Sequence, residues 1–325
     1  MAVSNARPLA IFTGYMILAA ALTLMSITII RGQTRRRVSP PLKNESSAAT
    51  VGSPRSHVIF GLLAALSLAT TWYHMFRFFE WSYTEWATAH AFKEGVAASG
   101  DEGLRLGEWL RDTSLFRQAW ASTLETGPRA WWSLQIFGFC ANWSVLLATQ
   151  ARKRSIPHAW IFMLLGQVVA ISFALNLSFL AILCSPIEDR KQQKKRKTHG
   201  ASPSSFVSWH TVILIITLLW ATSIPSAVGK PGFLALLLGP HLLAFVPLLG
   251  NKLLPTSLLG EPGSVWKTAS MAWVLSAAFK GVWNENQDIA VVFTTLYEHP
   301  AVSSVGWDVI CCWISFGAWS FVNLD

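Results

Sequence analysis

An all-α, polytopic membrane helix bundle is the fold class that the sequence predicts, on two observations. The first is composition: the chain of 325 residues is 52% hydrophobic and only 13% charged, about half the charged fraction of a typical soluble domain. The second is the gathering of its apolar residues into eight long runs. Because a helix needs about 20 apolar residues to cross the hydrocarbon core of a bilayer, we expect seven to eight transmembrane helices in a single transmembrane domain over residues 1–325.

Six of these runs are strongly apolar, and we expect each to form a transmembrane helix: Leu9–Ile30, Val58–Phe76, Trp160–Cys184, Phe206–Val228, Gly232–Gly250 and Val305–Val322. The runs Ala130–Thr149 and Ser264–Trp283 are weaker. The first run is longer than the apolar core of a signal peptide usually is, and basic residues follow it. We therefore expect a retained signal anchor whose C-terminal end lies in the cytoplasm.

The positive charge of the chain is concentrated in three connections. The net charge is +9, and fifteen of the 26 Lys and Arg lie in Arg31–Arg55, Arg152–Arg154 and Arg190–Lys197. Positive loops beside membrane helices mark the cytoplasmic side, so we expect a flexible cytoplasmic loop at residues 31–56 and a basic loop at residues 185–205. Nucleic-acid binding would need a folded basic face with stacking aromatic residues, and these connections lack that pattern. The expected partner is the lipid bilayer, including its anionic head groups.

The acidic charge lies in two other connections. Residues 80–128 hold eight of the 17 Asp and Glu, and the stretch LRLGEWLRDTSLFRQAWASTL within them has apolar residues at helical spacing. We interpret residues 80–128 as an amphipathic segment that lies on the lumenal surface. The segment Asn284–Pro300 is also acidic, and we expect it to share that surface.

Strict alternation of crossings conflicts with the charges at one place. The connections Arg152–Arg154 and Arg190–Lys197 are both basic and flank the apolar run Trp160–Cys184, so a crossing by that run would place them on opposite sides of the membrane. Keeping the longer basic connection in the cytoplasm and both acidic segments in the lumen requires one run that does not cross fully. We expect that run to be Ala130–Thr149, because it carries polar residues.

The densest group of residues that could carry chemistry is TWYHMFRFFEWSYTEW, residues 71–86. It combines aromatic rings, which stabilise cationic charge, with carboxyl groups, which can donate a proton when an apolar site keeps them neutral. One interpretation is an aromatic belt at the membrane interface, anchored by an Arg–Glu pair. The other is the wall of an active site that cyclises a polyene, with Glu80 and Glu85 as catalytic residues. The substrate-binding residues would then be Trp72, His74, Arg77, Trp81 and Trp86.

A second group lies in HPAVSSVGWDVICCWISFGAW, residues 299–319. Asp308 falls about one turn inside the last apolar run, where a lone acid is costly and is therefore a functional candidate. The alternative is an interfacial acid that the dipole of a helix N-terminus favours. Asp308 or Glu80 would be the general acid, with Glu85 supporting it, and Trp307 would belong to the substrate-binding wall. We expect Asp308, Glu80 and Glu85 to share one pocket.

Other motifs are absent or ambiguous. His241 follows Gly239 and Pro240 inside an apolar run, where it either lines a cavity or is a core histidine with satisfied hydrogen bonds. The sequence has no DDxxD-like cluster, P-loop, HExxH or GxSxG motif, and its four cysteines show no CxxC spacing. We therefore expect neither a metal nor a cofactor. Ionisation of a diphosphate, nucleotide hydrolysis and metalloproteolysis are disfavoured.

Three segments, TWYHMFRFFEWSYTEW, FALNLSFLAILCSP and HPAVSSVGWDVICCWISFGAW, resemble polytopic membrane proteins of fungal secondary-metabolite clusters, including the PaxA-type proteins of indole-diterpene clusters. The resemblance extends over most of the chain. Several small membrane proteins from such clusters are terpene cyclases that use acidic residues to protonate an olefin or an epoxide. The resemblance implies a membrane terpene cyclase, and it does so by analogy because those cyclases are shorter than this chain.

Two functions follow as expectations. The first is a multi-pass membrane enzyme of the endoplasmic reticulum that cyclises a lipophilic isoprenoid by protonation. The second is a non-enzymatic carrier for a lipophilic metabolite, or a scaffold that associates with other enzymes of a biosynthetic pathway. A carrier should keep polar residues midway across several helices. The acids of this chain gather towards one surface, which favours the one-sided pocket of an enzyme.

Overall fold

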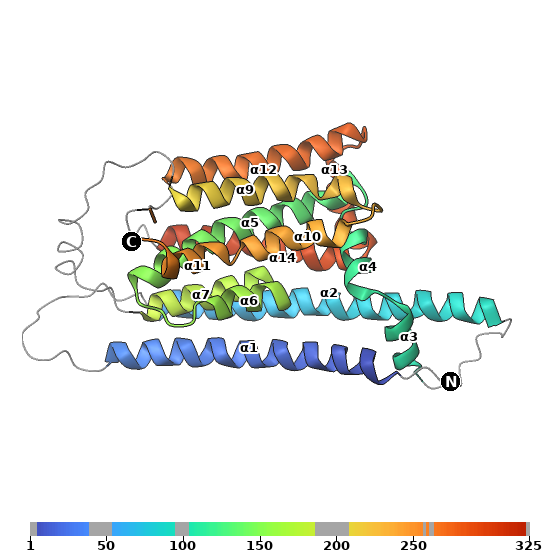
Figure 1. The fold of residues 1–325 in the computed structure, drawn as a ribbon, viewed down its shortest axis with the longest axis horizontal. Helices are drawn as coiled ribbons and strands as arrows, with labels where there is room; N and C mark the ends of the chain where they lie inside the picture. The colour runs from blue at the N-terminus through green and yellow to red at the C-terminus, as the bar shows by residue number, and fades with distance from the viewer. Residues whose placement is uncertain are drawn as a thin grey trace, which may run out of the picture.

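Every regular element of the described chain is a helix, which confirms the all-α prediction (Figure 1). The structure is a computed structural model that describes residues 5–38, 54–94, 104–185, 208–255, 258–259 and 263–322. Long helices lie side by side along one axis (Figure 1) and are α1 (Ala6–Val38), α2 (Pro54–Glu94), α5 (Gly127–Lys153), α9 (Trp209–Ser223), α12 (Ser264–Asn284) and α14 (Pro300–Val322). The pair α10 (Phe233–Leu243) and α11 (Val246–Leu253) runs beside them.

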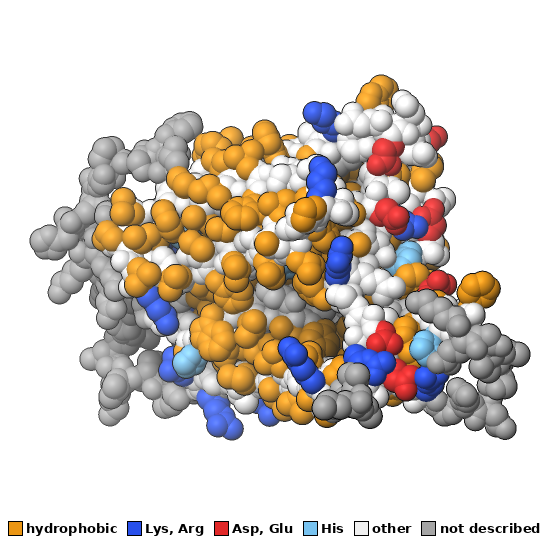
Figure 2. Space-filling model, turned by 45° about the vertical axis from the view of Figure 1, so that its right-hand side comes forward, with side chains coloured by type: hydrophobic (Ala, Val, Ile, Leu, Met, Phe, Trp, Pro, Cys, Tyr) orange, Lys and Arg blue, Asp and Glu red, His pale blue; other side chains and the backbone are white. Residues whose placement is uncertain are grey.

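The chain is a membrane protein by the length and composition of its helices. Among the described residues, three segments are long and apolar enough to cross a bilayer, namely Ala6–Arg36, Pro54–Phe92 and Pro300–Val322. The pair α10–α11, bent by 47°, would be a fourth span if it counts as one. Apolar side chains also cover the outside of the bundle: Leu62 and Leu242 are each 66% exposed. Figure 2 shows hydrophobic side chains over the middle of one face and acidic side chains gathered at its right-hand end.

The two acidic connections meet at one end of the bundle, as the sequence predicts. Arg129, near the start of α5, forms ion pairs with Glu125 at 3.2 Å and with Glu298 at 3.4 Å. The Gly127 amide donates a hydrogen bond of 2.7 Å to the Glu285 carboxylate. Glu298 ends the short helix α13 (Ile289–Glu298), so side chains from both acidic segments surround the start of α5.

The acidic segment 80–128 is not one surface helix. Its first part continues α2 as far as Glu94, and its later part forms α3 (Leu106–Asp112) and α4 (Leu115–Ser122). The Trp109 indole donates to the Ser82 hydroxyl at 3.2 Å, which joins α3 to the extension of α2. Residues 31–38 of the expected cytoplasmic loop are the end of α1 and residues 54–56 are the start of α2. The rest of that loop and residues 186–205 of the basic loop lie outside the described residues.

The run Ala130–Thr149, for which the sequence predicts an incomplete crossing, belongs to a helix that is not among the candidate membrane spans of the described chain. It lies within α5, a continuous helix of 27 residues and therefore about 40 Å long. Helix α5 packs against α12, α14, α9 and α7, and most of its side chains are buried. Its polar side chains have partners inside the bundle: the Trp313 indole donates to Gln135 at 3.0 Å, and the Ser270 hydroxyl donates to Asn142 at 2.9 Å.

The run Trp160–Cys184 is the one that turns back. It is divided into α6 (Trp160–Val168) and α7 (Ile171–Cys184), which lie side by side over one part of the bundle (Figure 1). Arg154, at the start of the short connection from α5 to α6, donates from one guanidinium nitrogen to the Ile182 and Ser185 carbonyls, both at 3.1 Å. The start of α6 and the end of α7 therefore lie at the same end of the bundle. The prediction of a single crossing helix here is wrong, because α6 and α7 form a hairpin whose tip lies inside the bundle.

Candidate functional site

A carboxylate from α14 holds the tip of the α6–α7 hairpin. Ala170 is extended (φ −167°, ψ 141°) and precedes the first turn of α7, but its side chain has no oxygen that could cap the helix. The Asp308 carboxylate supplies both acceptors: it accepts hydrogen bonds from the amides of Ile171 at 3.0 Å and Ser172 at 2.7 Å. Asp308 is only 7% exposed. Helix N-termini favour anions because their first amides lack backbone acceptors, so Asp308 stabilises a helix start inside the bundle.

On the other side of the hairpin tip, a backbone carbonyl accepts a hydrogen bond from a residue of α1. The Tyr15 hydroxyl donates a hydrogen bond of 2.6 Å to the carbonyl of Val168, the last residue of α6. Irregular backbone at membrane depth is tolerated only where its polar groups find partners. Tyr15 and Asp308 provide those partners from helices at opposite ends of the sequence.

A proline inside α10 makes its backbone irregular just before His241, whose side chain contacts the hairpin. Pro240 lies inside α10 and cannot donate to the Leu236 carbonyl, four residues earlier. The Trp220 indole donates to that carbonyl at 2.8 Å. A Cβ atom on Gly239 would lie 2.2 Å from the same indole, so glycine is required for this approach. His241 follows directly, and the sequence Gly-Pro-His therefore packs closely against α9.

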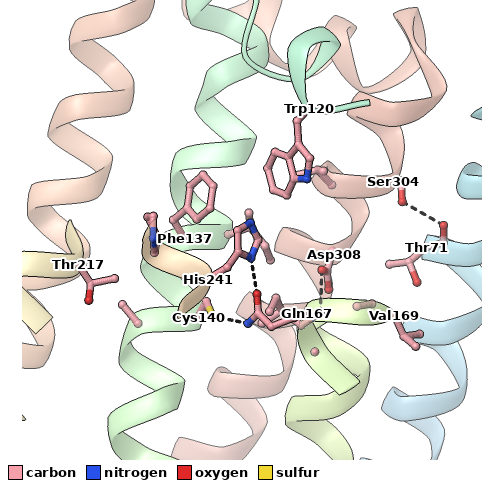
Figure 3. Close-up of a pocket in the computed structure, with 17 residues that line it drawn as sticks. Thr71, Trp120, Phe137, Cys140, Gln167, Val169, Thr217, His241, Ser304 and Asp308 are labelled. Carbon is pink, nitrogen blue, oxygen red and sulfur yellow. Dashed lines mark hydrogen bonds between the residues drawn. The ribbon is translucent and has the colours of Figure 1, made fainter. Parts of the chain in front are cut away.

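A cavity of about 150 Å³ lies between the hairpin tip, α5, α10 and α14 (Figure 3). Its Thr, Gln, His, Ser and Asp side chains come from five helices, namely α2, α6, α9, α10 and α14. The lining residues are Thr71, Trp120, Ile136, Phe137, Cys140, Ala141, Gly166, Gln167, Val169, Ala170, Ile171, Thr217, Pro240, His241, Ser304, Val305 and Asp308.

His241 presents one free ring nitrogen in this cavity. Its Nδ1 is hydrogen-bonded to Oε1 of Gln167, as Figure 3 shows. The amide nitrogen of Gln167 faces Cys140 Sγ at 3.2 Å and Met163 Sδ at 3.7 Å, so the amide oxygen is left for His241. In this arrangement Nδ1 carries the hydrogen and Nε2 carries a lone pair. Within the described residues, the buried Nε2 has no hydrogen-bond partner.

Aromatic rings wall the cavity around His241. Trp120 of α4 stacks on Phe137 of α5, with ring centroids 5.4 Å apart and planes 16° apart. Both rings meet the His241 imidazole edge-on, at 5.4 and 5.6 Å. The faces of such rings attract positive charge. The site therefore combines a proton-exchanging group with groups that stabilise a cation.

Of the three acids predicted to be catalytic, the structure places only Asp308 at the cavity. Glu80 lies on the extension of α2, where it pairs with Arg77 at 2.7 Å, and the two side chains are 63% and 58% exposed. Glu85 is also exposed. The structure does not bring these two glutamates together with Asp308 in one pocket.

The predicted substrate-binding residues lie outside the cavity lining as well. Trp72 packs against Phe76 at 5.6 Å, His74 against Tyr73 at 5.0 Å, and Trp86 stacks on His90 at 5.1 Å. Arg77 is exposed and Trp307 is half-buried.

Trp81 instead meets a histidine at the acidic end of the bundle. Its ring lies edge-on to the imidazole of His299, with centroids 4.3 Å apart. Burial, and then the charge of Arg129, lower the pKa of His299 to about 4. The His299 ring is therefore uncharged at neutral pH and packs as an aromatic group.

Sequence reasoning missed Trp120, Phe137 and Gln167, and left His241 between two interpretations. These side chains come from α4, α5, α6 and α10. The one local signal was Pro240 before His241, since a proline inside an apolar run marks irregular backbone. Within the described residues, no group of three or more His, Cys, Asp or Glu could hold a metal ion.

Comparison with known proteins assigns no family. No protein-family model matches the chain, and neither a curated protein nor a solved structure matches it.

Proposed function

We propose that the chain is a membrane enzyme that cyclises a lipophilic isoprenoid by proton transfer in the cavity at the hairpin tip. The observation that carries the proposal is the free Nε2 of His241, buried beside the stacked rings of Trp120 and Phe137. A proton-exchanging group next to cation-stabilising rings is what protonation-initiated cyclisation requires. The resemblance to membrane proteins of fungal secondary-metabolite clusters supports the same reaction.

The proposed reaction adds one proton and removes one. The Nε2 lone pair of His241 first takes up a proton from solvent, and the resulting imidazolium donates this proton to an epoxide oxygen or an alkene carbon of the substrate. The next double bond attacks the cationic carbon and closes a ring, and the rings of Trp120 and Phe137 stabilise the positive charge. The neutral Nε2 then accepts a proton from the carbon beside the final cation, which forms an alkene. The product is an isomer of the substrate, so no cofactor or oxidant is consumed.

The cavity volume limits what enters it. A cavity of about 150 Å³ holds a molecule of about the size of benzene, which is close to one isoprene unit. The reacting end of the substrate would occupy the cavity, while the remaining chain lies along the apolar outer surface, where Leu242 beside His241 is 66% exposed. Gln167 and Asp308 are positioning residues here, because Gln167 orients the imidazole and Asp308 holds the hairpin tip.

A carrier for a lipophilic metabolite is the second candidate, and the hairpin favours it. Broken helices that meet a binding cavity inside the membrane are typical of transporters. In a carrier, the same cavity would bind the substrate without proton transfer. Association with other enzymes of a pathway is compatible with either candidate.

We also propose seven crossings, formed by α1, α2, α5, α9, α10–α11, α12 and α14, in a membrane of the endoplasmic reticulum. A hairpin at α6–α7 leaves both basic connections around it on one side of the membrane. This removes the conflict between charge and alternation that a crossing at Trp160–Cys184 creates, and it leaves both acidic segments on the other side.

Labelling of single engineered cysteines tests this topology. In sealed microsomes, an impermeant maleimide should label Lys153→Cys and Gln192→Cys from the outside, whereas Gln287→Cys should be labelled only after permeabilisation. The four native cysteines are buried and give a low background. If Lys153→Cys and Gln192→Cys are labelled from opposite sides, the segment between them crosses and the hairpin is wrong.

Conversion of candidate polyprenyl epoxides in microsomes tests the enzyme. The wild-type chain should form a cyclic isomer, and His241→Phe should lower the rate about 100-fold or more, the contribution of general acid–base catalysis. Phenylalanine keeps the aromatic packing against Trp120 while it removes both ring nitrogens. Glu80→Gln is the matched control and should retain activity, because Glu80 is exposed and outside the cavity.

Unchanged substrate in every sample, with a monodisperse wild-type chain and with transport of a lipophilic metabolite intact, would reject the cyclase and leave the carrier. A His241→Phe variant with full activity would place the proton transfer on another group.

A further inference from the structure

The last turns of α1 form one wall of a crevice that is separate from the cavity at the hairpin tip. Its volume is about 230 Å³, and Pro157, in the connection between α5 and α6, contributes to its lining. The residues of α1 that line it recur at steps of four and therefore share one side of the helix. They are Thr28, Ile29, Gly32, Gln33 and Arg36. The candidate membrane span Ala6–Arg36 ends at this crevice.

Two side chains make the crevice polar. Arg36 is exposed, and no ion pair within the described residues includes it. Gln33 is only 2% exposed, and its side-chain amide has no hydrogen-bond partner in the described part of the chain. A buried amide without partners is unfavourable, and a ligand that hydrogen-bonds to it removes this cost. The crevice therefore offers a positive charge beside a buried amide that can donate hydrogen bonds.

The charge around the crevice complements an anion. The ion pairs of the described residues lie in or beside the two acidic segments, 80–128 and 284–300. The exposed charged residues near the crevice are basic: Arg31 and Arg35 lie on the last turns of α1, and Lys153 ends α5, four residues before Pro157. A negatively charged group in the crevice would thus meet positive charge from two elements of the fold.

Exposed apolar side chains continue from the crevice along the same side of α1. Leu18, Met25 and Gly32 follow at steps of seven residues, which is about two helical turns. Leu18 and Met25 are 42% and 43% exposed. Met25 lies about 10 Å from Gly32 along the helix axis and Leu18 about 21 Å, so these side chains cover the hydrocarbon depth of one leaflet, about 15 Å. The crevice and this apolar stripe together fit a molecule with an anionic group and long apolar chains.

We propose that the crevice binds the head group of one anionic phospholipid. The Arg36 guanidinium would contact the phosphate, the Gln33 amide would donate to another oxygen of the head group, and the acyl chains would lie against Met25 and Leu18. A free phosphate would use the same polar groups but would gain nothing from the apolar stripe. The site does not depend on the reaction in the cavity. The proposed topology enters only because anionic lipids give the cytoplasmic leaflet its negative surface.

Native mass spectrometry of the full chain in detergent tests the site, in titrations with phosphatidylinositol and with phosphatidylcholine of the same acyl chains. The wild-type chain should bind its first phosphatidylinositol about 5-fold more tightly, the effect of one Lys or Arg near an anionic lipid surface. Arg36→Gln should abolish this preference. Gly32→Leu should weaken phosphatidylinositol binding at least as much, because a Cβ atom on Gly32 meets nothing within 4 Å and the longer side chain would fill the crevice.

Each variant has a matched control on α1. Arg31→Gln removes the same charge, but Arg31 lies five residues before Arg36 and therefore about 140° around the helix from it. Gly14→Leu adds the same side chain at a glycine that is also surrounded by open space, and Gly14 is about 27 Å from Gly32 along the helix. Both control variants should keep the wild-type preference for phosphatidylinositol.

Three results would overturn the proposal. The first is equal binding of the two lipids by the wild-type chain. The second is a loss with Arg31→Gln as large as that with Arg36→Gln, which would show diffuse attraction to a basic surface. The third is unchanged binding by Gly32→Leu. Inorganic phosphate should not displace the lipid when it replaces chloride at equal ionic strength, and displacement would assign the crevice to a free anion instead.

Discussion

Replacing Asp308 with alanine is expected to destabilise the folded chain by about 2–6 kcal/mol, because it leaves two buried amides without acceptors and each unpaired donor costs about 1–3 kcal/mol. The substitution leaves the buried amides of Ile171 and Ser172 without acceptors. Because Ala170 cannot cap α7, no neighbouring side chain on the hairpin replaces the carboxylate. The free energy of unfolding can be measured by denaturant titration in mixed micelles, followed by circular dichroism.

Asp288 is the matched control for this substitution. Its carboxylate also caps a helix N-terminus, since it accepts from the Ala290 amide at 3.0 Å, but it lies at the exposed start of α13. Asp288→Ala should cost about 1 kcal/mol, the usual value for a cap in water. Equal losses for the two variants would show that Asp308 is no better shielded from water than Asp288, and the hairpin tip would then not lie inside the bundle.

The fold class could be predicted from the sequence because long apolar runs indicate helices that contact lipid. The hairpin could not be predicted in this way. The run Trp160–Cys184 is as long and as apolar as a crossing helix, and neither glycine nor proline marks the break at Ala170. The break depends on Tyr15 and Asp308, which are 153 and 136 residues away from their partners Val168 and Ser172.

The polar residues of α5 show another limit of composition. They count against a crossing helix only if they face lipid, and in the structure Gln135 and Asn142 face partners on α14 and α12. The composition of a segment therefore does not show whether its polar side chains face lipid or face partners inside the bundle. Helix α9 is apolar but has only 15 residues, and α12 has 21 residues but is not among the candidate spans of the described chain.

The candidate site was predictable where a residue is unusual in its own segment. Asp308 is the lone acid of the last apolar run. This feature made it a functional candidate, and in the structure it lines the cavity. Glu80 and Glu85 stand in a denser aromatic segment, but α2 extends for 41 residues and carries both glutamates beyond the cavity. Trp120, Gln167 and His241 meet only through the packing of α4, the hairpin and the kinked α10, which the linear sequence does not encode at short range.

A close approach of two backbones, at the contact between α5 and α12, gives the other stability prediction. A Cβ atom on Gly127 would lie 2.4 Å from the carbonyl oxygen of Gly281. The backbone would have to move to relieve this clash. Gly127→Ala should therefore destabilise the chain by about 1–3 kcal/mol, the usual cost of overpacking. The displacement would also weaken the hydrogen bond of 2.7 Å from the Gly127 amide to Glu285.

The same contact supplies its own control, because it is asymmetric. A Cβ atom on Gly281 would meet only the Cα atom of Gly127, at an ordinary 3.7 Å. Gly281→Ala should therefore be neutral or should stabilise the chain by up to about 1 kcal/mol, since alanine favours a helix interior over glycine. Unfolding free energies of the two variants, measured side by side, decide the matter. If Gly281→Ala proves the more harmful, α5 and α12 do not pack in this register, and the acidic end of the bundle is assembled differently.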